Sequence, residues 1–303
     1  MSPAASSTAL DPAVLDRLAG LSLVARTVVE GFMSGQHRSP QRGSSVEFAQ
    51  HRPYVRGDEL RHIDWKIFAR TDRLTVKEFV EETNFTCHLM VDASESMAFG
   101  SRDWTKLDYA RWCAASLAYL VIRQRDAASI SVFDSEMREQ IPPSNGAHQV
   151  GEIARLLEAA HPDGRTNLGE VLHSMAGRLS RRGIVCVFSD FFDDIDPIVS
   201  GLRRLTHAGH EPILFQVLDP MELDFDLENL RQLQGLEGSG RIKIDPKAIR
   251  QAYREEIERH RAELARQANA LSCDFVPLVT SEPVDVALST YLAHRIQRAR
   301  KRS

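Results

Sequence analysis

The stretch that decides the fold is residues 85–97, which reads F-T-C-H-L-M-V-D-A-S-E-S-M. Its first half is apolar and rich in residues that favour β-strands, and its second half is a polar loop. Asp92, Ser94 and Ser96 occupy alternate positions of that loop. Because carboxylate and hydroxyl oxygens are the ligands that hard divalent cations prefer, the stretch predicts a buried strand that ends in half of a metal site.

After this stretch, segments typical of strands alternate with segments typical of helices. Apolar and β-prone runs predict strands over residues 86–91, 127–133, 183–189, 212–218 and 273–278, with a hairpin partner at 137–141 and a turn at 142–146. Helical periodicity is found over residues 107–121, 150–159, 167–180, 197–208, 249–264 and 283–298. The run 183–189 has no polar alternation, which is typical of a central strand buried on both faces. The pattern predicts the α/β class, with a doubly wound, mostly parallel sheet, helices on both faces and an N-terminal arm.

The domain organisation follows from where this alternation begins and where it breaks. Residues 1–45 contain a polar tail, a helical period over 12–32 and a basic loop. We expect residues 46–84 to form an arm packed on a main domain of residues 85–299. A Gly-rich, acidic excursion interrupts that domain at residues 219–246, and residues 300–303 form a basic tail.

Composition excludes several classes of protein. The chain has 303 residues and a net charge of -4 from 38 basic and 42 acidic residues, so no global field favours nucleic acid. Its apolar runs are far shorter than the about 20 residues that span a bilayer, and its first residues do not resemble a signal peptide. The 4 cysteines are scattered and predict buried, reduced thiols. We therefore expect a cytoplasmic protein without a transmembrane segment.

Two later residues complete the predicted metal site. Thr166 lies in a loop that opens a helix, and Asp190 directly follows the strand 183–189. In a doubly wound sheet the carboxyl ends of the strands form a ligand crevice where the strand order reverses. If the strands before Asp92 and Asp190 are neighbours there, the set converges on Mg²⁺, or on Mn²⁺ or Ca²⁺. The alternative for the D-x-S-x-S string alone is a helix cap or an Asx turn.

The chemistry of this set favours docking over catalysis. A shell of neutral hydroxyls leaves the ion strongly electropositive, so it recruits an anionic oxygen from outside, such as a carboxylate of a partner protein. The sequence has no P-loop, no nucleophile elbow and no H-E-x-x-H motif. Two alternatives stay open. One is a metal-dependent phosphoester hydrolase with Glu95 or His161 as general base, and the other is a scaffold whose metal site is empty.

The segment 52–70 reads R-P-Y-V-R-G-D-E-L-R-H-I-D-W-K-I-F-A-R and alternates in charge between aromatic residues. The favoured interpretation is a lattice of Arg–Asp pairs that pins an ordered arm. The other is a partner-binding surface, because Arg, Tyr and Trp are frequent interface anchors. The residues concerned are Arg52, Tyr54, Arg56, Asp58, Arg61, Asp64, Trp65 and Arg70. Asp58 is also a candidate cap for a short helix that runs through Phe68.

Together these motifs resemble a known family. The order D-x-S-x-S, Thr, Asp on an α/β alternation resembles the von Willebrand factor A domain with its metal-ion-dependent adhesion site. The segment 52–70 is similar to the signature R-x-Y-x-x-G-D-x-x-R-x-I-D-W-x-x-x-A-R of a bacterial family, domain of unknown function 58. The resemblance runs from about residue 43 to near the C-terminus. It implies a von Willebrand factor A-like domain that acts as the partner or adaptor of a MoxR-type AAA+ ATPase. Many members carry N-terminal transmembrane helices, and none is found in this sequence.

Overall fold

The computed structural model describes residues 46–55, 63–81, 86–146, 148–179, 181–224, 233–234, 241–242 and 246–302. Two compact units account for the chain from residue 32 onward, namely Phe32–Asn84 and Phe85–Ser303. The smaller unit is the arm, and the larger unit contains the main sheet.

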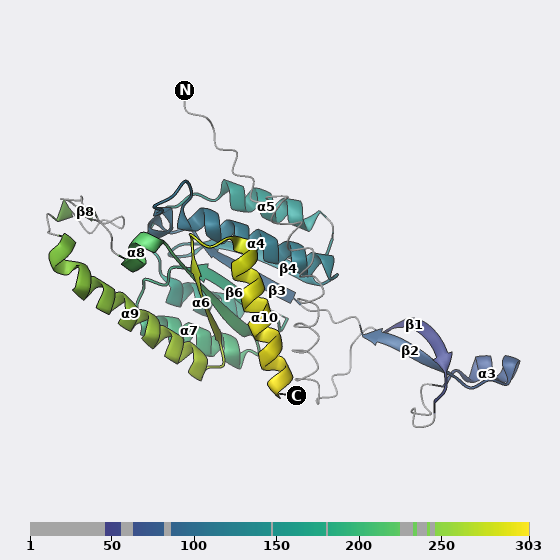
Figure 1. Ribbon diagram of the computed structural model, residues 1–303. Helices are drawn as coiled ribbons and strands as arrows, with labels where there is room; N and C mark the ends of the chain where they lie inside the picture. The colour runs from purple at the N-terminus through teal and green to yellow at the C-terminus, as the bar shows by residue number, and fades with distance from the viewer. Residues whose placement is uncertain are drawn as a thin grey trace. The chain divides into compact units, whose positions relative to one another are not determined.

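The main sheet has six strands in the order β10-β7-β6-β3-β4-β5. Strands β3, β4 and β6 of this sheet are labelled in Figure 1. Its strands are β3 (Thr86–Asp92), β4 (Ala127–Phe133), β5 (Met137–Ser144), β6 (Ile184–Ser189), β7 (Glu211–Leu218) and β10 (Asp274–Val279). Neighbouring strands are parallel except for β4 and β5, which are antiparallel. The predicted α/β class with a doubly wound, mostly parallel sheet is confirmed.

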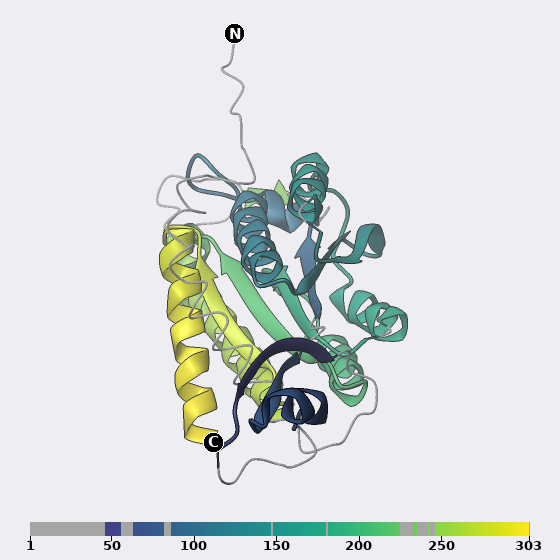
Figure 2. The ribbon, with the colours of Figure 1, turned by 90° about the vertical axis from the view of Figure 1, so that its right-hand side faces the viewer.

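Helices lie on both sides of this sheet, which explains why every residue of β3 and β6 is buried (Figure 2). The helices are α4 (Lys106–Arg123), α5 (Gln149–Ala159), α6 (Leu168–Arg178), α7 (Ile195–His207), α9 (Pro246–Ala270) and α10 (Val284–Arg302). α4 packs on β3 and β4 and also contacts α5 and α10. α6 and α7 pack against each other, and α7 contacts α9. None of the described helices is long and apolar enough to cross a membrane.

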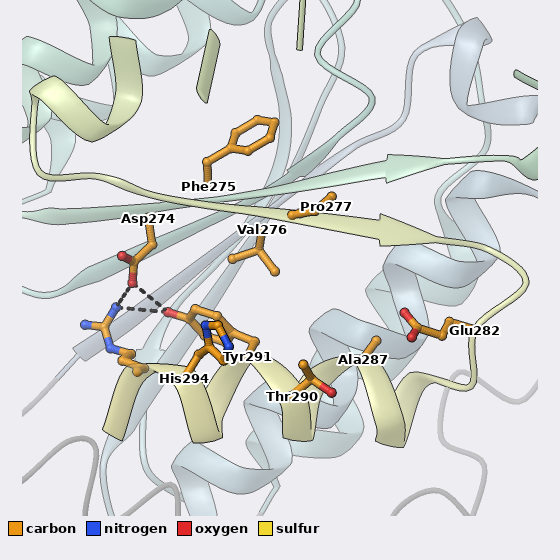
Figure 3. Close-up of a pocket in the computed structure, with 10 residues that line it drawn as sticks. Asp274, Phe275, Val276, Pro277, Glu282, Ala287, Thr290, Tyr291 and His294 are labelled. Carbon is orange, nitrogen blue, oxygen red and sulfur yellow. Dashed lines mark hydrogen bonds and ion pairs between the residues drawn. The ribbon is translucent and has the colours of Figure 1, made fainter. Parts of the chain in front are cut away.

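The edge formed by β10 and α10 contains a cavity of about 230 Å³ (Figure 3). Arg295 of α10 is buried beside it and forms ion pairs with Asp274, at 2.7 Å between Nη1 and Oδ2, and with Glu211. This arrangement is a buried cation that is held by two carboxylates from two neighbouring strands.

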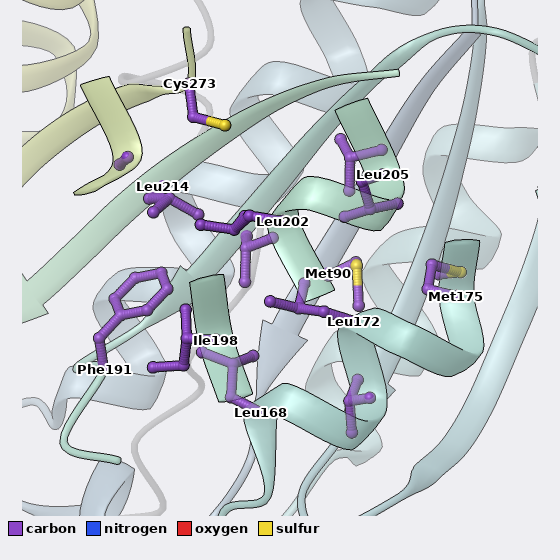
Figure 4. Packing of buried hydrophobic residues seen from close by; sticks show 14 of the residues in the cluster. Met90, Leu168, Leu172, Met175, Phe191, Ile198, Leu202, Leu205, Leu214 and Cys273 are labelled. Carbon is purple, nitrogen blue, oxygen red and sulfur yellow. The ribbon is translucent and has the colours of Figure 1, made fainter. Parts of the chain in front are cut away.

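The core beneath α6 and α7 is closely packed (Figure 4). Its strand residues include Val185 and Val187, which are two positions apart and therefore face the same side of the sheet. Glycines set the distance between the two helices. A Cβ added at Gly201 of α7 would lie 2.6 Å from Leu172 Cβ, and one added at Gly169 of α6 would lie 2.4 Å from Pro197 Cβ. Since each helix begins just after a loop of the candidate site, this spacing also sets the distance between those loops.

Two local expectations are corrected by the structure. The chain does not turn at Pro142, because β5 continues to Ser144. β5 is an edge strand, and an edge strand tolerates prolines because its outer N–H groups have no strand to pair with. The predicted helix from Asp58 through Phe68 is also wrong, since the helix of the arm is α3 (Trp65–Thr71).

The arm is built on a β-ribbon that the sequence analysis did not predict. β1 (Val46–Pro53) pairs antiparallel with β2 (Thr75–Glu81). Ile63 forms a bridge with Val76, and Asp64 then caps α3 by accepting hydrogen bonds from Lys66 N at 3.0 Å and Ile67 N at 3.2 Å. The cap is therefore Asp64, because the bridge at Ile63 keeps the preceding backbone extended.

The remaining domain assignments stay predictions. Residues 1–45 lie outside the described residues, and the packing of the arm on the main domain stays a prediction. The excursion at 219–246 contains α8 (Pro220–Asp224) and a small ribbon of β8 (Leu233–Gln234) and β9 (Arg241–Ile242). The 4 cysteines are buried and form no disulfide, as expected.

The helix spacing leads to a stability prediction. Gly201→Ala should destabilise the protein by roughly 1–3 kcal/mol, because the new methyl group would overlap Leu172. Gly177→Ala is the matched control on α6, where a Cβ would meet only the end of the Arg204 side chain at 3.9 Å. The control should be neutral or stabilising by up to about 1 kcal/mol, the usual helical gain. Urea unfolding measures both, and equal effects would contradict the close approach.

A buried histidine leads to a prediction about acid stability. His88 of β3 is buried and forms a hydrogen bond with Ser129, with 2.7 Å between His88 Nδ1 and Ser129 Oγ. Burial, followed by the proximity of His210, lowers the pKa of His88 from 6.5 to about 4. Between these values the unfolded chain binds a proton at His88 that the folded protein does not, so acid favours unfolding.

We therefore expect stability to fall as the pH drops from 6.5 to about 4, with up to roughly 3 kcal/mol coming from His88. His88→Gln should make the pH dependence of the unfolding free energy shallower in that window, whatever it does to stability at neutral pH. His207→Gln, which replaces an exposed histidine, is the control and should leave the slope unchanged. Identical slopes for His88→Gln and wild type would contradict this account.

Candidate functional site

The candidate site lies where the strand order of the main sheet reverses. β3 and β6 are parallel neighbours, with Val91 opposite Phe188. From β3 the sheet continues through β4 to β5 on one side, and from β6 it continues through β7 to β10 on the other. Asp92 ends β3 and Asp190 directly follows β6, so both carboxylates lie at the carboxyl ends of adjacent central strands. This is the position where ligands bind in doubly wound sheets.

Both oxygens of the Asp92 carboxylate accept hydrogen bonds from the protein. Ser94 N donates to Oδ1 at 2.9 Å, and Ser189 Oγ donates to Oδ2 at 2.5 Å. Asp92 is fully buried. Burial and then the charge of Asp190 raise the pKa of Asp92 to about 7, against the lowering effect of these hydrogen bonds. The carboxylate is thus held in one orientation.

The two serine hydroxyls of the loop lie together. Ser94 Oγ and Ser96 Oγ are 3.2 Å apart. Ser94 precedes the short 3-10 helix η2 (Glu95–Ala98), yet its side chain makes no capping hydrogen bond. Capping of a following helix therefore does not account for the Ser94 hydroxyl, although the bond from Ser94 N to Asp92 does have the form of an Asx turn.

The loop that contains Thr166 is joined to the serine loop by backbone hydrogen bonds. Asp163 N donates to Ala93 O, and Glu95 N donates to Gly164 O, each at 2.9 Å. Gly164 has a φ of 71°, a left-handed conformation that glycine adopts without strain. The Thr166 hydroxyl is buried and has no hydrogen-bond partner in the described residues. An unsatisfied buried hydroxyl is costly, so its oxygen is suited to an ion held beside the serine loop.

Asp190 is held by a buried lysine that sequence reasoning missed. Lys106 Nζ lies 2.7 Å from Asp190 Oδ2 and 2.6 Å from Glu222 Oε1. Burial by itself would raise the pKa of Asp190, but the charge and hydrogen bond of Lys106 outweigh it, and Ser96 adds to the lowering. The net shift of the pKa is downward, so Asp190 carries a full charge. The sequence feature that could have revealed Lys106 is its place in the first turn of a helix, where the helix dipole disfavours a cation.

The loop after Asp190 is strained and presents an aromatic ring. Phe191 has a φ of 58° although its side chain is buried, which is a rare conformation for a bulky residue. Its N–H donates to Ser189 Oγ at 3.0 Å, and its carbonyl accepts from His260 Nε2 at 2.8 Å. The next residue, Phe192, is 38% exposed and its ring centre lies 5.3 Å from Lys106 Nζ. His260 thus supports the loop by packing and hydrogen bonding.

The proposed partner-binding residues of the arm belong to the other unit. Arg56, Asp58 and Arg61 lie outside the described residues. Asp64 caps α3, Trp65 is 58% exposed, and Arg70 is in the last turn of α3. Both the Arg–Asp lattice and the partner-binding surface stay predictions. Of the two suggested general bases, His161 is exposed and Glu95 makes the backbone bond to Gly164.

Within the described residues, no group of three or more His, Cys, Asp or Glu side chains could hold a metal ion. The candidate site is of a different kind, with two carboxylates and several hydroxyls. Such an oxygen-only set suits Mg²⁺, Mn²⁺ or Ca²⁺ and not the softer metals that prefer thiolate or imidazole.

Comparison with known proteins decides the family. Residues 50–263 match the family described as "Protein of unknown function DUF58". The chain belongs to this family. The predicted membership is therefore confirmed, and the match covers both the signature segment of the arm and most of the main sheet.

The DUF58 protein is similar to uncharacterised proteins of mycobacteria. It is 27% identical over 293 residues to Rv1480 of Mycobacterium tuberculosis (strain H37Rv) and to Mb1516 of Mycobacterium bovis, covering 94% of this chain and 90% of each relative. Among solved structures, BatB from Bacteroides thetaiotaomicron is 16% identical with a TM-score of 0.47, covering 70% of this chain and 99% of that one. The SpRpn10 VWA domain is 11% identical with a TM-score of 0.37, covering 68% and 94%.

Proposed function

We propose that the crevice between β3 and β6 binds Mg²⁺, or Mn²⁺ or Ca²⁺, and that the bound ion docks a carboxylate of a partner protein. Ser94, Ser96 and Thr166 would hold the ion directly, and Asp92 and Asp190 would hold it directly or through water. The observation that carries this proposal is the buried Thr166 hydroxyl, which has no hydrogen-bond partner among the described residues. It belongs to a loop whose residues 163 and 164 are hydrogen-bonded to the loop of the two serines. The bound ion would supply a Lewis-acidic position for an anionic oxygen.

The protein partners of the two carboxylates favour a bound ion that would stay electropositive. Both oxygens of Asp92 already accept hydrogen bonds, and Asp190 shares its charge with Lys106. The protein thus offers the ion little uncompensated negative charge. A divalent cation in such a shell attracts a further anionic ligand, and a carboxylate from another protein is suited to that place.

For the partner we propose a MoxR-type AAA+ ATPase. The support is the membership of the chain in the DUF58 family, together with the association that the family resemblance implies. In this proposal the protein acts as a metal-dependent interaction module that connects the ATPase to its client.

Metal binding is tested by calorimetry with MgCl₂ or MnCl₂ and no partner. Thr166→Val keeps the shape of the side chain but removes the hydroxyl, so the affinity should fall at least about tenfold, equivalent to about 1.4 kcal/mol. Asp92→Ala should show no binding heat. Thr290→Val, at an exposed position of α10, is the matched control and should bind like wild type. Equal heats for all four proteins would contradict the proposed site.

Partner binding is tested with a purified MoxR-type ATPase from the same organism. Binding measured by biolayer interferometry in MgCl₂ should weaken at least about tenfold in EDTA and, to a similar extent, in Thr166→Val. The control is again Thr290→Val. Binding that persists in EDTA would instead favour a scaffold without metal. Phosphoester turnover that Asp190→Ala abolishes would favour the hydrolase.

A further inference from the structure

Lys106 is a fully buried cation in a place that helix formation does not favour. It is the first residue of α4, and its side chain is 0% exposed. The N-terminal end of a helix carries a partial positive charge, so an ammonium group there is repelled. Removing an ammonium group from water adds a large desolvation cost. Interactions outside α4 must therefore hold Lys106 in place.

Those interactions are two carboxylates from different elements. Asp190, which follows β6, and Glu222 of α8 both contact Lys106 Nζ, at 2.7 and 2.6 Å. The other oxygen of Glu222 accepts a hydrogen bond from Asp219 N at 2.9 Å. Asp219 Oδ2 in turn accepts from Ser101 N and Thr280 Oγ1, each at 3.0 Å. The ammonium group thus connects the candidate metal site to α8 and its anchored N-terminus. We call Lys106, Asp190 and Glu222 the lysine fork.

The fork places two cations in competition for one carboxylate. A divalent ion drawn to Asp190 meets an ammonium group that is already bound to the same side chain, and like charges at close range repel. Glu222 removes the obstacle. Because it already contacts Nζ, Lys106 stays paired when Asp190 turns to the metal, and no buried charge is left without a partner.

We infer that Lys106 is an internal counter-cation which holds Asp190 in the metal-free protein and passes to Glu222 when the metal binds, so that metal occupancy is coupled to α8. This inference rests on the metal site proposed above. Lys106 and Glu222 act as positioning residues, because neither is a proposed ligand of the ion.

The test measures binding of Mg²⁺ alone to the full chain by calorimetry. Lys106→Met removes the competing cation and should tighten Mg²⁺ binding at least tenfold. Glu222→Gln removes the alternative partner, ties Lys106 to Asp190 and should weaken binding at least tenfold. The two variants break the same buried network, so a merely structural role would move both affinities in the same direction or move neither.

The double variant Lys106→Met/Glu222→Gln separates coupling from the general electrostatic field. If Glu222 acts through Lys106, Glu222→Gln should change the affinity less than threefold once Lys106 is absent. A change of the same size in both backgrounds would mean independent charges and would overturn the coupling.

Arg295→Met is the matched control. Arg295 is also a buried cation held by two carboxylates, Asp274 and Glu211, but these lie on β10 and β7 away from the lysine fork. This variant should lower the melting temperature and leave Mg²⁺ affinity within threefold of wild type. A large change in its affinity would show that loss of any buried cation disturbs the site, and would overturn the specific role of Lys106.

Hydrogen exchange supplies a readout at α8. In wild type, Mg²⁺ should slow exchange of the backbone amides of α8, because Lys106 then pairs with Glu222 alone. In Lys106→Met the same amides should not respond to Mg²⁺. An α8 that responds equally in both proteins would overturn the inference. If Lys106→Met does not fold, Glu222→Gln decides by itself, since unchanged or tighter binding in that variant overturns the inference.

The outcomes separate this inference from the function on which it rests. If wild type binds Mg²⁺ and Lys106→Met binds equally or more weakly, the counter-cation role fails and the metal site stands. If wild type binds no metal but Lys106→Met does, the counter-cation role stands and metal-dependent docking by the natural protein fails. If neither protein binds metal, both are overturned.

Discussion

Parallel pairing between β3 and β6 is the interaction on which the rest of the molecule depends. It places the ends of two fully buried strands side by side at the reversal of strand order. Asp92 and Asp190 meet there because Asp92 is the last residue of β3 and Asp190 directly follows β6. Burial, and then the charge of Asp190, raise the pKa of Asp92. Much of the surrounding structure serves to hold these two carboxylates.

Neutral hydrogen-bond donors and one buried cation compensate the negative charge of these two carboxylates. Ser189 and the Ser94 amide hold Asp92, while Lys106 holds Asp190. The strained turn at Phe191 fits the same account, because its N–H and carbonyl are bonded to Ser189 and His260. Backbone strain of this kind persists only where the surroundings over-determine the conformation. The closely packed α6 and α7 then fix the loops from which Thr166 and Phe191 come.

Much of the main sheet could be read from local patterns. The central position of β6 was predictable because its uninterrupted apolar run is typical of a strand buried on both faces. The pairing of β3 with β6 was only a condition of the predicted site, and the order of the strands comes from the structure. The β-ribbon of the arm was harder to predict from the sequence. Its strands β1 and β2 lie about twenty residues apart, and neither has a strict alternation of apolar and polar residues. The extended course of β5 through Pro142 was missed because prolines usually end strands, and only the edge position of β5 permits it.

The sequence by itself determined the α/β class and the family, because these depend on local patterns and on a signature of fixed spacing. It also proposed five candidate ligands for the metal site. Only the tertiary structure decided which groups surround those ligands. Lys106, Ser189 and Glu222 belong to three separate segments, and their meeting depends on how α4, β6 and α8 pack. The charge balance of a buried site is a sum over all its neighbours in space. For that reason the loop 92–96 suggests which kind of ion the proposed site would hold, whereas the fold decides which charges surround that site.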